Sequence, residues 1–153
     1  MAPHIVTGWN PLAGDFPSKD DQVFELLTAA VFQARFRPDV VRKRWPNIRE
    51  GFMHFELEVV ASWPDEKLAE LMEFEGMIRN TKKIRATLLN ARELKTYSCQ
   101  YGDLQAYLCS FGNDQEALVR DIDTWAHYIG APSIRWFVQA SSARSEDRNS
   151  CCE

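Results

Sequence analysis

His127-Tyr128-Ile129-Gly130-Ala131-Pro132-Ser133 is a short connection between two stretches whose apolar residues have helical spacing. Leu118 and Ile122 precede it, four residues apart, and the largely apolar run 134–140 follows it. Glycine suits a tight connection, and proline fits the first turn of a helix. The segment therefore predicts two helices joined by a tight hairpin.

The rest of the chain has the same helical periodicity. Two examples of buried stripes at three- and four-residue spacing are Val23, Leu26, Leu27, Ala30, Val31 and Ala34, and later Ile84, Leu88, Ala91 and Leu94. No stretch alternates convincingly between apolar and polar residues, as a half-buried strand would. We therefore expect an all-α protein of about eight short helices, with one domain over residues 1–140 and a polar, mobile tail over 141–153.

Helix boundaries follow from capping residues and prolines. Asp20 and Asp21 offer caps and negative charge at the start of the first helix. Pro38 predicts the start of a second helix that reaches about Trp45, and Pro46 predicts a further restart.

Composition excludes several classes of protein. Hydrophobic residues make up 45% and charged residues 26%, with seven Gly and seven Pro, which is a globular composition rather than a disordered or collagen-like one. No apolar run approaches the roughly 18 residues of a membrane span, so no membrane partner is expected. Residues 1–10 lack the pattern of a signal peptide. The four cysteines form no C-x-x-C pair, and a chain with this much core-forming material does not need a disulfide framework, so we expect a reduced, cytoplasmic protein.

Basic residues are clustered although the net charge is −4. Twelve of the 18 Lys and Arg residues fall in the two windows 35–49 and 79–95. One interpretation is an electropositive face that contacts phosphate, and the other is a pair of ordinary solvated helix faces. Charge alone does not decide between them.

The hairpin has its own potential chemistry. Gly130 would allow a phosphate to approach the backbone closely, and the free N–H groups that open the next helix favour an anion. Such contacts position DNA without reading its sequence. The alternative is a plain helix–helix turn.

Four groups of residues carry a family resemblance. They are Val23 to Leu27 leading into Phe32-Gln33-Ala34, then Phe52, then Ile78-Arg79-Asn80 with Lys83-Ile84 and Asn90-Ala91-Arg92, and finally Tyr128-Ile129-Gly130 with Phe137-Val138-Gln139-Ala140. Their order and spacing over residues 16–140 resemble DNA-3-methyladenine glycosylase I, of the helix-hairpin-helix DNA glycosylase superfamily. The resemblance implies a monomeric, cofactor-free DNA repair enzyme of that helical fold. It would act in base excision repair at the nucleoid, on double-stranded DNA that contains alkylated bases.

The resemblance also implies a mechanism and residues for it. Such enzymes flip an alkylated purine out of the duplex and hydrolyse its N-glycosidic bond. The base pocket would be formed by Trp9, Phe16, Gln33 and Trp45, although Trp45 fits the core equally well. Arg35 and Phe36 would fill the vacated base stack; the alternatives are a phosphate contact for Arg35 and core burial for Phe36.

Contacts to the DNA backbone are implied at two places. The residues are Arg79, Asn80, Lys82 and Lys83 at a helix start, and His127, Gly130 and Ser133 at the hairpin. For the helix start, the alternative is a solvated, capped terminus.

This sequence departs from the family pattern at several positions. Ala30 stands three residues before Gln33, where the family has its pocket glutamate, and Pro38 stands where it has a pocket tryptophan. The family's zinc ligands are also missing: Asp147 replaces the histidine that would pair with Cys151, so we expect no metal.

No catalytic residue is therefore assigned. The leading hypothesis is a monofunctional 3-methyladenine-type DNA glycosylase. The main alternative is a non-catalytic DNA- or lesion-binding protein that keeps the fold, and a third is an all-α protein-interaction module.

Overall fold

The computed structural model describes residues 8–142, and every regular element within them is a helix. The elements are α1 (Asp20–Gln33), α2 (Pro38–Gly51), the short 3₁₀ turn η1 (Met53–Phe55), α3 (Leu57–Ala61), α4 (Lys67–Glu73), α5 (Thr81–Tyr101), α6 (Leu104–Cys109), α7 (Gln115–Trp125) and α8 (Ala131–Ser141). The prediction of an all-α protein with about eight helices is confirmed. None of these helices is long and apolar enough to cross a bilayer. Helix α8 ends at Ser141, and residues 143–153 of the expected tail lie outside the described residues.

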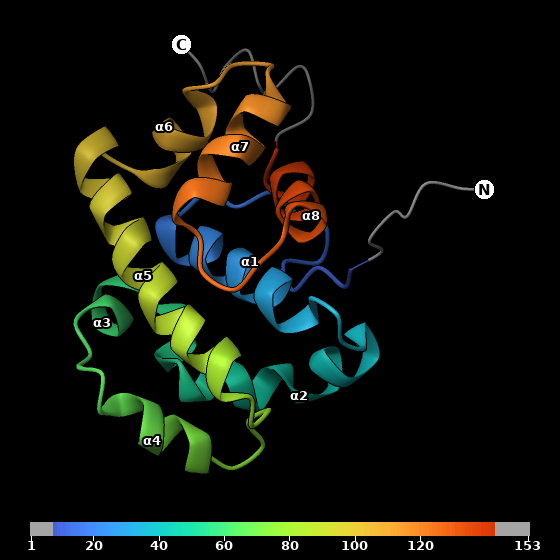
Figure 1. Ribbon diagram of the computed structural model, residues 1–153, viewed down its shortest axis with the longest axis vertical. Helices are drawn as coiled ribbons and strands as arrows, with labels where there is room; N and C mark the ends of the chain where they lie inside the picture. Colours follow the sequence, from blue (N-terminus) through green and yellow to red (C-terminus); the bar gives the residue numbers. More distant parts are fainter. Residues whose placement is uncertain (1–7, 143–153) are drawn as a thin grey trace.

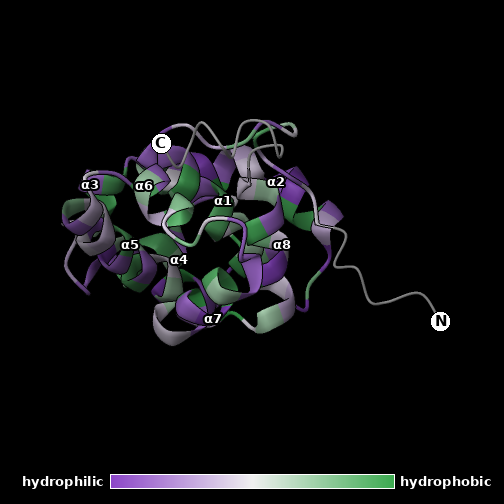
Figure 2. Ribbon diagram, turned by 90° about the horizontal axis from the view of Figure 1, so that it is seen from above, coloured by the Kyte–Doolittle hydropathy of each residue, from purple (hydrophilic) through white to green (hydrophobic). Residues whose placement is uncertain are grey.

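Helix α1 lies in the middle of the molecule. Figure 1 shows α6, α7 and α8 on one side of it and α2, α3 and α4 on the other, with the long α5 running past both groups. All residues from Val23 to Gln33 are buried, so α1 has almost no solvent-facing side. Figure 2 shows hydrophobic residues concentrated on the inner sides of the helices and hydrophilic residues outside.

The start of α1 holds two other helices in place. The Asp21 carboxylate accepts a hydrogen bond from the backbone N–H of Leu57, the first residue of α3, at 2.9 Å. The Asp20 carboxylate accepts one from the N–H of Leu104, the first residue of α6, also at 2.9 Å. These aspartates therefore satisfy free N–H groups at the starts of distant helices, whereas the sequence suggested that they cap α1 itself.

The predicted break at Pro46 is wrong, because α2 continues through it to Gly51. Proline removes one backbone hydrogen bond from a helix interior. Here Pro46 lies on the exposed side, while Val41, Trp45 and Ile48 on the opposite side are buried. Core packing along that side holds the helix across the missing bond.

A left-handed turn follows α2. Met53, His54 and Phe55 have φ values of 52°, 57° and 58°, a conformation that costs about 1–2 kcal/mol per non-glycine residue. Phe55 is completely buried, and its ring stacks on those of Trp45 and Phe52 at 5.3 and 5.8 Å. Burial of this ring offsets the strain and leaves His54 exposed to solvent.

Lys83 of α5 caps the C-terminal end of α1. Its ammonium group donates hydrogen bonds to the carbonyl oxygens of Phe32 and Ala34, the latter at 2.9 Å. A cation at a helix C-terminus also interacts favourably with the helix dipole. Burial lowers the pKa of Lys83 to about 8, so the charged form still predominates at neutral pH.

We expect the substitution Lys83→Met to lower the free energy of unfolding by about 1–3 kcal/mol, because it leaves two carbonyl groups without their donor. Urea denaturation measures this loss. Lys82→Met is the matched control, since the neighbouring Lys82 is exposed and its loss should change stability by less than about 0.5 kcal/mol. Equal stability of the two variants would show that the ammonium group does not hold the end of α1.

Candidate nucleic-acid interface

Three segments that are distant in sequence meet at the start of α5. The Lys83 ammonium lies 5.0 Å from the ring centre of Phe36, in the loop after α1. The Lys82 ammonium lies 5.9 Å from the ring centre of Tyr128, in the hairpin between α7 and α8. The loop after α1 and the hairpin therefore both lie against the start of α5.

The loop between α1 and α2 projects its side chains outward. Phe36 is 40% exposed, which excludes core burial as its role. Arg35 is also exposed and has a φ of 54°, a conformation that only a minority of non-glycine residues adopt. An exposed phenylalanine beside positive charge has the shape and surroundings of a wedge for a base stack.

The four residues predicted to contact the DNA backbone at the start of α5 differ in solvent exposure. Arg79 and Lys82 are exposed, whereas the Asn80 side chain caps α5 by accepting the N–H of Lys83 at 3.1 Å. Lys83 itself is only 5% exposed, and its ammonium group is engaged by α1. Lys83 therefore offers little charge to a DNA backbone, because its ammonium group is bound by carbonyl groups inside the protein.

The hairpin is open to solvent. Tyr128 is 51% exposed with a φ of 56°, and Gly130, the N-cap of α8, is also exposed. Gly130 has a φ of −98°, so glycine is not required there for backbone conformation. A Cβ at this position would meet only the Pro132 ring, at 3.8 Å, so the space in front of it is free for a ligand. Ser133 is 9% exposed and presents little of its side chain.

The side chain of Asn90 in α5 binds the backbone of the hairpin at His127. Its side-chain oxygen accepts the backbone N–H of His127 at 2.7 Å, and its amide nitrogen donates to the carbonyl of the same residue at 3.4 Å. The His127 ring lies 3.4 Å from the Glu93 carboxylate and is partly exposed. The position of the hairpin is thus set by α5, the same helix that carries Lys82.

Three of the four residues predicted for the base pocket lie together. The backbone N–H of Trp9 donates to the Gln33 side chain at 2.6 Å, and the Gln33 amide donates back to the Trp9 carbonyl at 2.8 Å. The rings of Trp9 and Trp45 meet edge to face at 5.5 Å. Gln33 therefore anchors the segment before α1, and Trp45 is a core residue that is 4% exposed. Phe16 is 42% exposed and has no ring contact among the described residues.

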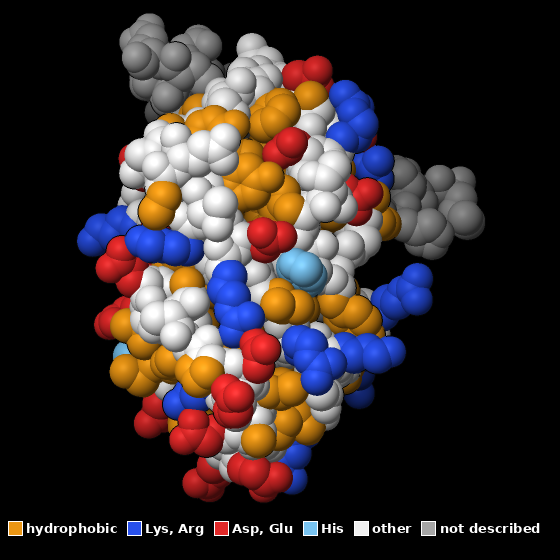
Figure 3. Space-filling model, turned by 60° about the vertical axis from the view of Figure 1, so that its left-hand side comes forward, with side chains coloured by type: hydrophobic (Ala, Val, Ile, Leu, Met, Phe, Trp, Pro, Cys, Tyr) orange, Lys and Arg blue, Asp and Glu red, His pale blue; other side chains and the backbone are white. Residues whose placement is uncertain are grey.

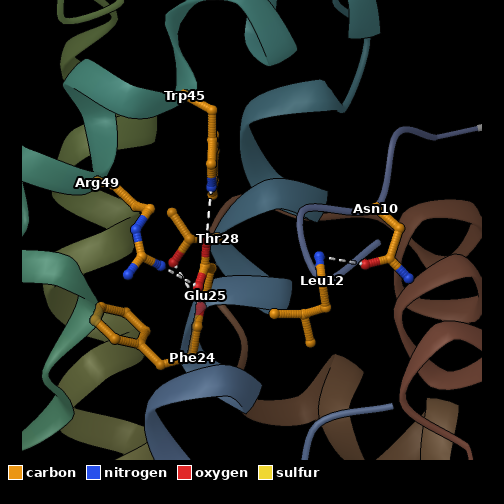
Figure 4. Close-up of polar contacts among 7 residues, drawn as sticks. All are labelled: Asn10, Leu12, Phe24, Glu25, Thr28, Trp45 and Arg49. Atoms are coloured by element: carbon orange, nitrogen blue, oxygen red, sulfur yellow. Dashed lines mark hydrogen bonds and ion pairs between the residues drawn. The ribbon is translucent and has the colours of Figure 1, made fainter. Parts of the chain in front are cut away.

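The position at which the resemblance implies a pocket glutamate is occupied by a buried methyl group. Ala30 is 2% exposed and belongs to the hydrophobic core. The nearest carboxylate along the buried side of α1 is Glu25, and Figure 4 shows it bound by Trp45 and Arg49 of α2. The Trp45 indole N–H donates to it at 2.8 Å and the Arg49 guanidinium at 2.6 Å. Glu25 is thus a partnered structural group.

The triad of Glu25, Trp45 and Arg49 was not foreseen from the sequence. A glutamate inside an otherwise apolar helical stripe was the available signal, since a buried carboxylate requires a partner. Its partners lie 20 and 24 residues away, however, and only the packing of α2 against α1 brings them together.

The outer surface carries both signs of charge. Figure 3 shows one face on which Lys and Arg side chains gather near a histidine and exposed hydrophobic groups, while Asp and Glu crowd one end. This arrangement presents positive charge locally on a protein whose net charge is −4. Among residues 8–142, no three His, Cys, Asp or Glu side chains are grouped as metal ligands. The positions compared with the zinc site, Asp147 and Cys151, lie outside that range.

A family model and solved structures that are similar to this chain are all methyladenine glycosylases. A family model described as methyladenine glycosylase matches residues 14–132. A crystal structure of 3-methyladenine DNA glycosylase I is 23% identical, with a TM-score of 0.70 over 84% of this chain and 81% of that chain. The enzyme of that name from Staphylococcus aureus is 21% identical, with a TM-score of 0.74 over 84% and 79%. At these identities, the structural matches establish the fold.

We expect Asn90→Ala to loosen the hairpin selectively, because both bonds that fix His127 are lost. Hydrogen exchange at the His127 amide should then speed up by roughly tenfold or more, equivalent to about 1.4 kcal/mol or more of lost protection. Thr87→Val is the control, since it removes a buried hydroxyl bond within α5 and leaves the hairpin contacts intact. Equal acceleration in both variants would refute a specific role for Asn90.

Proposed function

Because the chain belongs to the methyladenine glycosylase family, we propose that it binds duplex DNA at alkylated bases and releases an alkylated purine by hydrolysis. The observation that supports this most directly is that the exposed side chains of Phe36 and Tyr128 both lie against the start of α5, Phe36 beside Lys83 and Tyr128 beside Lys82. Three segments with the chemistry of a wedge, a phosphate contact and a backbone-binding hairpin converge there.

On this proposal, each part of the surface has one task. Phe36 enters the base stack and occupies the space that a flipped nucleotide leaves. Arg79 and Lys82 neutralise phosphates, which supplies affinity without reading sequence. The exposed backbone at Gly130 and the start of α8 hold a further phosphate, because free N–H groups and the helix dipole favour an anion.

The chemical step suits a site without a strong base. An adenine alkylated on its ring carries a positive charge, so its bond to the sugar is already weakened. Water bonds to the sugar carbon C1′ and loses one proton to solvent, while the cationic base takes the electron pair of the broken bond and leaves as a neutral ring. The protein then contributes mainly by flipping and holding the base.

One observation favours a second function. Ala30 is a buried core residue at the position of the family's pocket glutamate, so no carboxylate meets a cationic base there. A protein that recognises damaged DNA without cleaving it would need the contact surface and could dispense with that group. This candidate shares every DNA contact of the first and differs only in base release.

Base release separates the two functions. We expect the purified protein to liberate 3-methyladenine from alkylated duplex DNA, detected by chromatography of the free base. Unmodified duplex is the control and should release none. Binding of alkylated duplex without release of any alkylated purine would reject the glycosylase and support the binding protein, and failure to bind duplex at all would reject both.

We expect Phe36→Ala to weaken binding to alkylated duplex by roughly tenfold, because a cavity in the base stack is left unfilled. Met53→Ala is the matched control, since Met53 is a comparably exposed apolar side chain on η1 and should leave affinity unchanged. Fluorescence anisotropy at fixed salt concentration measures both variants. Loss of affinity in both, or in neither, would contradict a wedge at Phe36.

A further inference from the structure

Aromatic side chains from three helices pack together where the C-terminal half of α5 meets α6 and α7. This aromatic cluster consists of Tyr97 and Tyr101 of α5, Tyr107 of α6, Phe111 just after α6, and Trp125 at the end of α7. The Tyr97 ring lies 4.5 Å from the ring of Tyr107 and 5.3 Å from that of Trp125. None of the five residues belongs to the proposed DNA contacts.

The outer side of the aromatic cluster is open to solvent. Tyr107 and Trp125 are buried, whereas Tyr97 is partly exposed and Tyr101 is 39% exposed. The buried Tyr107 ring holds Tyr101 edge to face at 5.3 Å, and the rings of Tyr97 and Tyr101 stack at 6.3 Å. Tyrosine rings that are already fixed supply contact area at a low cost in conformational entropy. The two exposed rings therefore form a preorganised contact surface.

Two carboxylates border these rings. The Tyr107 hydroxyl donates to one oxygen of Asp121 at 2.5 Å, and the other oxygen accepts no hydrogen bond from the described part of the chain. The Glu93 side chain, one turn before Tyr97 on α5, is 37% exposed and lies 3.4 Å from the His127 ring. Burial raises the pKa of Tyr97, and the negative charges of Asp121 and Glu93 add to the rise. Both carboxylates thus lie close enough to act on that ring.

The aromatic cluster has acidic surroundings and no cation of its own. Residues 97–125 contain five acidic residues and a single basic one, Arg120. Lysine ammonium groups lie over the rings of Trp63, Phe36 and Tyr128, but among residues 8–142 none lies over a ring of the cluster. Figure 3 shows hydrophobic side chains bordered by acidic ones above the pale-blue histidine. Ring faces and carboxylates both attract positive charge, so this surface is complementary to a cation.

The chemistry of the surface favours guanidinium groups. A guanidinium is planar, so it stacks on an aromatic ring, and its fork of N–H donors also matches a carboxylate. A lysine ammonium presents only a compact charge. A single exposed cation–π contact is weak, so a ligand of this open surface needs several cations on one chain. Nucleic acid is disfavoured here, because its phosphates would face the carboxylates.

We propose that the aromatic cluster is a docking surface for an arginine-rich segment of another protein. Its guanidinium groups stack on Tyr97 and Tyr101 and bind the carboxylates of Glu93 and Asp121. Charge complementarity selects this partner, since the rings supply the stacking faces and the two acids supply the anions. The proposal does not depend on base release or on DNA binding.

Fluorescence anisotropy tests the proposal with a labelled peptide of four arginines alternating with glycine, and with the same peptide carrying lysine in place of arginine. We expect the arginine peptide to bind at least threefold more tightly than the lysine peptide, and Tyr101→Ala to weaken it by roughly threefold. Tyr128→Ala is the matched control, since Tyr128 is an exposed tyrosine that already has the Lys82 ammonium over its ring. It should leave peptide affinity unchanged.

A second pair of variants tests the charge. Asp121→Asn keeps an oxygen that can accept the Tyr107 hydroxyl but removes the negative charge, so it should also weaken the arginine peptide by roughly threefold. Asp123→Asn is its control, because Asp123 is exposed on the same helix, does not border the rings and changes the net charge equally. Near-UV circular dichroism confirms that each variant retains its packed aromatic core.

Several results would overturn the proposal. They are no binding of the arginine peptide, equal affinity for the arginine and lysine peptides, and equal weakening by Asp121→Asn and Asp123→Asn, which would indicate attraction by net charge alone. Weaker binding of duplex DNA to Tyr101→Ala would assign the surface to DNA instead. A dimer that sedimentation detects in the unmodified protein and that Tyr101→Ala abolishes would assign it to a second copy of the chain.

Discussion

Burial of α1 on all sides from Val23 to Gln33 is the constraint on which the structure depends. Residues Val23 to Gln33 of α1 are all buried, so every polar group on that segment needs a partner from the protein. The Thr28 hydroxyl donates to the carbonyl of Phe24, and Glu25 is bound by two groups of α2. Within the described part of the chain, no buried side-chain nitrogen or oxygen lacks a partner.

The same partners position the candidate sites. Lys83 satisfies the C-terminal carbonyl groups of α1, which brings the start of α5 beside Phe36. Gln33 holds the backbone of Trp9 at the other side of that helix end. Glu25 fixes the side chains of Trp45 and Arg49 on α2. Polar groups that only make burial of α1 possible thus also determine where the surface residues lie.

Periodicity was sufficient to predict the helices, because apolar spacing and helix caps are local signals. The cap of α5 at Asn80 shows this, since acceptor and donor are three residues apart. The failures all involve long-range packing. Asp20 accepts a hydrogen bond from the N–H of Leu104, 84 residues away, and Lys83 donates one to the carbonyl of Ala34, 49 residues away. Pro46 stays within a helix because of burial on the opposite side, which no local pattern records.

The residue at position 30 relates the burial of α1 to the proposed recognition of a cationic base. A carboxylate on a fully buried helix is costly unless a partner neutralises it, as Arg49 does for Glu25. At position 30, a cationic base would be such a partner only while it is bound. Alanine removes that cost in the free protein and also removes electrostatic preference for a cationic base. On the proposed function, discrimination among bases would then rest on shape, stacking and the lability of the bond itself, which favours bases that already leave easily.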